Sequence, residues 1–281
     1  MSYPILNIYE FGEHLLESED LDPVYIMLNR ANLDFTTKAQ WCLAYWCTYH
    51  VGVASYVTQK GESDESLYWQ TLGDAARNDT ACPTGARWPR GKERRHWRGA
   101  QAKQSWQHLR EVYEAGPEGF VLRLKECAPD YQRVANYVDT HRGFGPWMSF
   151  KIADMLEQVF STHVNFTNAA VFMFKDPKEA ALRFWRRHQK LPDSAKPREL
   201  EPTLNHVIQH LTDYFAGKGY VCPNGERPVA LPEIETILCK WKSHENGHYP
   251  LRNDITELHH QLGDWSSVSS LAQSLKEAVP V

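Results

Sequence analysis

Apolar residues recur at helical spacing along most of the chain, and strand-like alternation is scarce. Residues 41–57 are apolar on nearly every helical face, which predicts a buried central helix. Thr37 and Gln40 stand where a capping box would begin it. The same periodicity predicts further helices at 101–115, 118–126, 130–141, 148–160, 176–188, 203–215, 232–243 and 254–263. The predicted fold class is therefore all-α.

Polar, proline and glycine residues divide these helices. Asp176, Pro177 and Glu179 predict a capped helix start, Asp254 and Glu257 predict another, and Gly263 predicts the end of the last helix. The Pro-rich stretch 189–202 is short enough to be a connection within one domain. We therefore expect a single helical domain over residues 1–281, with a sub-boundary near 189–202.

Residues 141–154, His-Arg-Gly-Phe-Gly-Pro-Trp-Met-Ser-Phe-Lys-Ile-Ala-Asp, predict two helices joined by a tight turn. Gly143 and Gly145 permit a close backbone approach, and Pro146 suits the first turn of the second helix. The free amides at such a helix start attract anions. The inner stripe of that helix is Ile152, Met155, Leu156 and Val159. An ordinary turn between two helices has the same spacing, so both interpretations stay open here.

Charge is unevenly distributed, although the net charge is only −4. Residues 87–103 contain one acidic residue, two tryptophans (Trp88 and Trp97) and seven cations: Arg87, Arg90, Lys92, Arg94, Arg95, Arg98 and Lys103. A solvated loop and a phosphate-binding loop both fit this run. The excess of arginine over lysine favours phosphate, which guanidinium binds in a bidentate manner.

Cysteine usage and hydropathy indicate the compartment. The six cysteines form no C-x-x-C pair, which fits reduced thiols in a cytoplasm. No apolar run reaches the length of a membrane helix, and the N-terminus lacks the features of a signal peptide. We expect a cytoplasmic protein that does not enter the membrane.

The glycine turn resembles the helix-hairpin-helix element of the DNA glycosylase superfamily. Three further segments, WCLAYWCTYH, WPRGKERRHWRG and LCKWKSHENGHYPLRNDITEL, make the chain similar to the amino acid:DNA transferase family of bacteriophages. This family is also called the alpha-glutamyl/putrescinyl thymine pyrophosphorylases. The four segments together extend over roughly residues 36–262.

The resemblance implies substitution at the 5-methylene group of a thymine derivative in duplex DNA. An amino acid or polyamine nitrogen would displace pyrophosphate from 5-pyrophosphoryloxymethyl-deoxyuridine. The donor would be glycine, serine, glutamate or an ornithine-like amine. If phage-encoded, the protein would act in the host cytoplasm. The chemistry requires a nucleobase flipped out of the duplex, cations that face the pyrophosphate, and a general base that deprotonates the amine.

Residues in the matching segments are the candidates for these roles. We assign catalysis to His50, Lys240, His244 and Asp254. We assign DNA and phosphate binding to Arg87, Arg90, Lys92, Arg94, Arg95, His96, Arg98, Gly143, Gly145 and Lys151. The base pocket is assigned to Trp46, Tyr49, Trp147, Asn165 and Asn168. In one helix, Trp46 and His50 would share a face at i, i+4. His50 has two interpretations, a satisfied core histidine and a general base.

Asn165 or Asn168 stands near the position where helix-hairpin-helix glycosylases carry a catalytic aspartate. A neutral amide cannot stabilise an oxocarbenium ion, which argues against glycosidic cleavage. Two alternatives stay open, a base-excision glycosylase and a non-catalytic partner of a hydroxymethyluracil DNA kinase. We expect no organic cofactor. A divalent metal is left open, and a zinc site of Cys239, His244, His248 and a later histidine is the weaker alternative.

Overall fold

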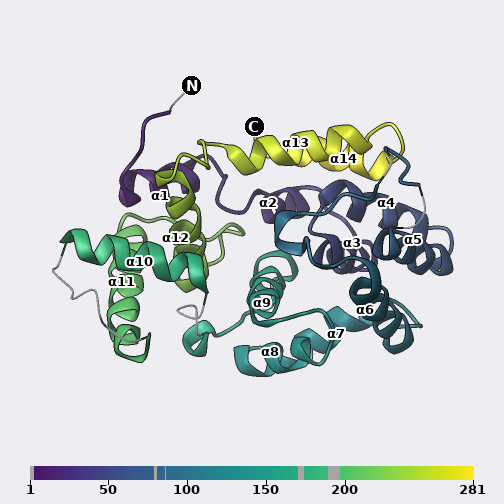
Figure 1. The fold of residues 1–281 in the computed structure, drawn as a ribbon, viewed down its shortest axis with the longest axis horizontal. Helices are drawn as coiled ribbons and strands as arrows, with labels where there is room; N and C mark the ends of the chain where they lie inside the picture. The colour runs from purple at the N-terminus through teal and green to yellow at the C-terminus, as the bar shows by residue number, and fades with distance from the viewer. Residues whose placement is uncertain (1–2, 79–80, 86, 170–173, 189–196) are drawn as a thin grey trace. The chain divides into compact units, whose positions relative to one another are not determined.

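The computed structural model describes residues 3–281 apart from 79–80, 86, 170–173 and 189–196 (Figure 1). All regular structure in these residues is helical, accompanied only by isolated bridges such as that between Asp130 and Asn165. This confirms the predicted all-α class. Within the described part of the chain, no helix has both the length and the apolar character needed to span a bilayer.

The chain divides into two compact units. Unit 1 comprises residues 1–23, 166–255 and 280, and unit 2 comprises residues 24–165, 256–279 and 281. The predicted sub-boundary near 189–202 falls mainly on residues 189–196, which lie outside the described part. The single domain over 1–281 stays a prediction, because compactness does not by itself define an independent fold.

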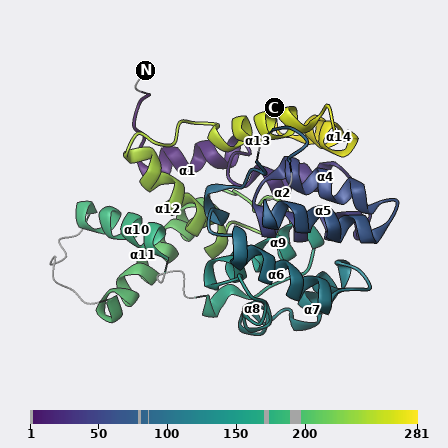
Figure 2. The same ribbon diagram turned by 45° about the vertical axis from the view of Figure 1, so that its right-hand side comes forward.

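Unit 2 is built around α4, which packs against α3, α5 and α14. A second group joins α7, α8 and α9 (Figure 2). Helix α7 also contacts α3. The helices of this unit are α2 (Pro23–Arg30), α3 (Phe35–Thr48), α4 (Val51–Gly61), α5 (Glu65–Arg77), η1 (Lys92–Arg94), α6 (Gly99–Val112), α7 (Glu118–Cys127), α8 (Tyr131–Asp139), α9 (Pro146–Phe160) and α14 (Ser270–Ala278).

The predicted central helix is two helices. Tyr49 takes a left-handed conformation (φ 51°) and ends α3, and His50 is extended (φ −140°) and begins α4. The start of α3 also differs from the prediction. Asp34 is the N-cap, and its carboxylate accepts from the Thr37 amide at 3.0 Å, so the Thr37–Gln40 capping box is wrong.

Unit 1 packs α1 (Ile8–Glu17), α10 (Lys175–His188) and α11 (Pro197–Gly217) against α12 (Leu231–Glu245). Its core includes Phe11, Phe215 and Trp241. The connecting helix α13 (Asn253–Trp265) begins in unit 1 and ends in unit 2.

Three predicted helix signals in these segments are wrong. Asp176 and Glu179 do not cap α10, because both lie within it and bind Lys242 at 2.6 and 2.5 Å. Asp254 likewise lies inside α13 and pairs with Lys240. Gly263 does not end α13, which continues to Trp265. In the first two cases a tertiary ion pair engages the carboxylate that the local signal assigned to a cap.

Candidate nucleic-acid interface and active site

The turn between α8 and α9 has the geometry of an anion site. Gly143 has φ +91°, a backbone conformation that would be strained in a residue with a side chain. Gly145 is the N-cap of α9, and no side chain there accepts a hydrogen bond from the helix amides. A Cβ on Gly145 would meet nothing within 4 Å. Pro146 occupies the first turn, as predicted. The first amides of α9 are therefore not covered by a capping side chain.

In the basic loop, residues 87–98, every third residue from Trp88 onward is buried. Trp88, Arg94 and Trp97 are buried, and Gly91 is buried between them. Its Cβ would lie 2.3 Å from the carbonyl oxygen of Tyr49, so only glycine fits there. The exposed positions of the loop are the basic residues Arg87, Lys92, Arg95, His96 and Arg98, together with the acidic Glu93. The loop therefore separates buried anchors from cations that face solvent.

Arg94 fastens this loop to the hairpin. Its Nη1 donates to the Gly143 carbonyl at 2.7 Å, and its Nε donates to the Cys47 carbonyl at 3.1 Å. The guanidinium also lies over the rings of Phe144 and Trp97, 5.1 and 6.0 Å from their centroids. The exposed cations beside Arg94 in sequence are thereby held next to the glycine turn.

Two of the arginines predicted to bind phosphate are engaged by carbonyls of the protein itself, and their phosphate contacts stay predictions. Arg94 is 7% exposed, and its guanidinium is engaged by carbonyls within the protein. Arg90 donates to the carbonyls of Ala75, Ala76 and Trp88, where it satisfies the end of α5. Burial, together with a smaller repulsion from Arg98 and Arg94, lowers the pKa of Arg90 to about 10. Burial also lowers the pKa of Arg94. Lys151, on α9, is also only 7% exposed.

Tyr49 and Trp147 form an aromatic pair beside the start of α9. Their ring centroids are 5.4 Å apart, and Tyr49 also stacks on Tyr45 at 4.6 Å. Both are half-buried, so each keeps exposed ring surface. Trp46 differs, because it is fully buried and its Nε1 donates to the Met155 sulfur at 2.9 Å. Its burial does not support the predicted role in a base pocket, which stays a prediction.

The two asparagines lie after α9. The Asn165 backbone amide donates to the Pro129 carbonyl at 2.7 Å, which ties this segment to the start of α8, and its side chain is exposed. Asn168 ends the short helix η2 (Phe166–Asn168) in unit 1. Their roles toward a base stay predictions.

His50 caps α4. Its Nδ1 accepts from the Val53 amide at 3.3 Å, and the residue is 8% exposed. Burial lowers the pKa of His50 to about 4, so the ring is neutral at pH 7 and weakly basic. The break at Tyr49 also removes the shared helical face predicted for Trp46 and His50. The geometry matches the core-histidine interpretation.

His244 is fully buried in unit 1 between the rings of Tyr3 and Phe11. Its Nε2 accepts from the Leu6 amide at 3.0 Å, and its Nδ1 donates to the Tyr249 carbonyl at 2.8 Å. Both ring nitrogens are therefore engaged, which leaves neither to accept an amine proton or to bind zinc. Among the described residues, no three His, Cys, Asp or Glu side chains gather as a metal site.

Lys240 and Asp254 are brought together, with Nζ and Oδ2 at 2.7 Å. Lys240 also donates to the carbonyls of Asp20 and Leu21 at 2.7 and 2.5 Å. Burial would lower the pKa of Lys240, but Asp254, Asp22 and Asp20 outweigh it and raise that pKa. Burial would likewise raise the pKa of Asp254, and Lys240 lowers it. This pair joins α12 to the start of α13 within unit 1, whereas His50 belongs to unit 2.

The sequence interpretation missed the polar side chains buried along α9. Asp154 is 2% exposed, Glu157 is 4% exposed and Gln158 is 1% exposed. The Tyr25 hydroxyl, from α2, donates to Asp154 Oδ2 at 3.0 Å. The available signal was the spacing of Lys151, Asp154 and Glu157, which lie three residues apart in a helix whose other positions are mainly apolar.

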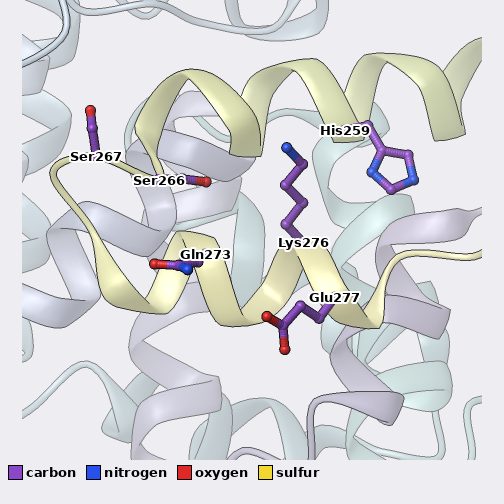
Figure 3. A pocket seen from close by; sticks show the side chains of 6 residues that line it. All are labelled: His259, Ser266, Ser267, Gln273, Lys276 and Glu277. Atoms are coloured by element: carbon purple, nitrogen blue, oxygen red, sulfur yellow. The ribbon is translucent and has the colours of Figure 1, made fainter.

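An open cavity of about 600 Å³ lies between α13 and α14 (Figure 3). His259 and Lys276 point toward it from the two helices, and Glu277 lies at its lower edge. None of the site residues predicted from the sequence lines this cavity. It is therefore separate from the hairpin and the basic loop.

Comparison with known proteins adds a family to this geometry. The family model described as amino acid:DNA transferase matches residues 11–248. A glycinyltransferase of Pseudomonas phage PaMx11 is 45% identical over 290 aligned positions, which cover 99% of this chain and 98% of the relative. A putrescinyltransferase of Delftia phage PhiW-14 is 21% identical over 94% of this chain and 81% of its own length.

Proposed function

This chain belongs to the amino acid:DNA transferase family, and from that premise we propose its substrate, its donor and its DNA-binding surface. It is a transferase that joins an amino acid or polyamine to DNA in the modification of thymine. The proposed donor is glycine, supported by the relative that is 45% identical over nearly the whole chain and is named a glycinyltransferase.

The proposed substrate is 5-pyrophosphoryloxymethyl-deoxyuridine in duplex DNA. The amine nitrogen of glycine attacks the 5-methylene carbon and forms a C–N bond. The C–O bond to pyrophosphate breaks, and the pyrophosphate leaves with the electron pair. The donor ammonium loses its proton to a base so that the nitrogen lone pair is available. No oxidant or reductant is needed.

The proposed DNA surface is the glycine turn with the exposed cations of the basic loop. The observation that carries it is the hydrogen bond from Arg94 to the Gly143 carbonyl, which joins the loop that bears Lys92, Arg95 and Arg98 to the turn before α9. Amides at a helix start and arginine side chains are both preferred phosphate ligands. The turn then acts as a helix-hairpin-helix element that grips one DNA phosphate.

A reaction at the base requires the nucleotide to leave the duplex. Tyr49 and Trp147 are the proposed stacking surface for the extruded base, since both rings lie beside the turn and keep exposed area. The proposal does not use His50, Lys240, His244 or Asp254, because the protein itself engages the side chains of all four. Their catalytic assignments stay predictions.

We propose that the reaction needs no organic cofactor, because the leaving pyrophosphate already makes the carbon electrophilic. The proposed compartment is the host cytoplasm, where phage DNA is modified.

One assay separates the proposed activity from its alternatives. Duplex DNA carrying the pyrophosphorylated base is incubated with glycine, digested to nucleosides and analysed by mass. A glycine adduct of thymidine together with released pyrophosphate supports the transferase. Abasic sites, seen as strand breaks after alkali, would show a glycosylase, and unchanged DNA would show a binding module. DNA carrying unmodified thymine is the control and should not react.

A further inference from the structure

The cavity between α13 and α14 is lined by polar side chains that are available to a ligand (Figure 3). Within the described part of the chain, no side-chain hydrogen bond or ion pair engages His259, Gln273 or Lys276. The volume of about 600 Å³ lies within the range of pockets that take a drug-sized ligand, and free glycine would fill little of it. The cavity therefore offers unused hydrogen-bond donors and the room for a group larger than an amino acid.

A glycine of α13 makes room for the Lys276 side chain. A Cβ added to Gly263 would lie 3.2 Å from Lys276 Nζ and 3.9 Å from its Cε. Gly263 lies inside α13, where glycine destabilises a helix by about 1 kcal/mol relative to alanine, and its φ does not require glycine. The position therefore keeps space for an ammonium group at the expense of helix propensity.

The positive and negative side chains of these two helices face different ways. His259 and Gly263 are four residues apart on α13 and share one face, whereas Asp264 follows Gly263 directly and faces another direction. His259 and Lys276 point toward the cavity, and Glu277 lies at its lower edge, directed away from the Lys276 ammonium group (Figure 3). The inside of the cavity thus presents a cation and neutral donors, a set that suits an anion.

The cavity is attached to the basic loop by two tryptophans, although none of the loop residues lines it. Trp265, which ends α13, and Trp88 of the loop are both buried, and their ring centroids lie 5.9 Å apart. Ser266, which follows Trp265, lines the cavity, and the exposed Arg87 precedes Trp88. All four residues belong to unit 2. The tryptophan contact therefore joins the segment that lines the cavity to the segment that begins the basic loop.

We propose that this cavity is a second phosphate-binding site, which takes a backbone phosphate of the duplex that the basic loop binds; this rests on the proposed DNA-binding function. Each DNA strand presents a phosphate about every 3.4 Å along the helix axis, so a duplex held at the basic loop brings further phosphates to the adjoining surface. Lys276 supplies the charge, and His259 and Gln273 supply N–H donors. Such a contact fixes the position of the duplex without reading its sequence.

The test measures the affinity of the full-length protein for unmodified duplex DNA at several salt concentrations. Lys276→Gln should weaken binding by up to about fivefold, the value of one exposed charge pair, and should lower the slope of log affinity against log salt by about 0.9. Lys276→Arg should retain the native slope, and Lys38→Gln, outside the cavity, is the matched control. Gly263→Ala should weaken binding without lowering the melting temperature, because its methyl group displaces Lys276 while the helix gains propensity.

An unchanged affinity and salt slope in Lys276→Gln would overturn the proposal. Calorimetric titration with inorganic pyrophosphate, in the absence of DNA, tests the other source of phosphate. Pyrophosphate binding that Lys276→Gln abolishes, together with an unchanged DNA slope, would assign the cavity to the free anion and overturn the DNA contact. If Lys276→Gln lowers the slope but the native protein forms no glycine adduct, the proposed transfer reaction fails and the second phosphate site stands.

Discussion

At the residue scale, arginines from one short loop have different tasks. Arg94 and Arg90 bind backbone carbonyls, whereas Arg95 and Arg98 face solvent. Composition and charge predicted the loop but could not separate its structural arginines from its exposed ones. That distinction depends on which carbonyls lie within reach of each guanidinium. The tryptophans could have indicated the division, because Trp88 and Trp97 are buried and Arg94 lies at the same three-residue spacing from them.

Arg94→Ala should destabilise the fold by about 3 kcal/mol, because it removes two charged hydrogen bonds and leaves their carbonyls buried. Chemical unfolding measures this change. Arg95→Ala, at an exposed position next in the chain, is the matched control and should change the free energy of unfolding by less than about 0.5 kcal/mol. Equal effects of the two substitutions would contradict the assigned role of Arg94.

His50 makes stability depend on pH in a defined window. Its pKa is about 4 in the folded protein because of burial, and about 6.5 when unfolded. Between these values the unfolded chain binds the proton, so this contribution is complete above pH 6.5 and is lost as the pH falls to about 4. The loss reaches about 3 kcal/mol. His50→Asn keeps a capping side chain and should flatten the stability profile in this window. An unchanged slope would show that His50 titrates normally.

At the scale of elements, periodicity located most helices that begin or end at glycine or proline. It could not find the break between α3 and α4, because residues 41–57 are apolar throughout and a left-handed tyrosine leaves no sequence signature. The sequence interpretation also proposed no helix where α1, α2, α5 and α14 form.

The hairpin offers a comparison between two glycines. Gly143→Ala should cost about 1–3 kcal/mol, because φ is +91° and the new Cβ would lie 3.1 Å from Ser105 Oγ. It should weaken DNA binding by displacing the turn. Gly145→Ala has φ −121° and open space around the Cβ, so it should change stability little. Thermal unfolding and DNA titration of both variants decide whether the conformation of Gly143 matters.

His244 links α12 to the N-terminal segment. His244→Ala should lower the free energy of unfolding by several kcal/mol, because it removes two buried hydrogen bonds and opens a cavity between aromatic rings. Transfer activity per folded molecule should stay near the native value. A folded variant with transfer slowed about 100-fold would instead restore the role of general base predicted from the sequence.

At the scale of the whole molecule, the chain carries net charge −4 and yet concentrates cations beside one turn. The family and the all-α class could be predicted from the sequence, because several motifs recur in order. The catalytic centre could not be predicted from the sequence. A lysine and an aspartate such as Lys240 and Asp254 give the same sequence pattern whether they bind a substrate or form an ion pair with each other.

DNA binding should therefore depend steeply on salt despite the negative net charge. Replacing Lys92, Arg95 and Arg98 with alanine should lower the slope of log affinity against log salt by about 0.9 for each phosphate that is no longer bound. Replacing Lys38, a cation outside the loop, should leave the slope unchanged. The slope is read from titrations of duplex DNA at several salt concentrations. A slope that is the same in the triple variant would place the phosphate-binding residues elsewhere.

The three-residue alternation of the basic loop also bears on how this protein can be changed. Its buried positions hold the loop in place, while its exposed positions project into solvent, where Arg95 donates to the neighbouring His96 ring. Exposed side chains can thus be exchanged for neutral, acidic or longer ones at little cost to folding. A library confined to residues 87, 92, 95, 96 and 98 would vary the recognised DNA on an unchanged scaffold.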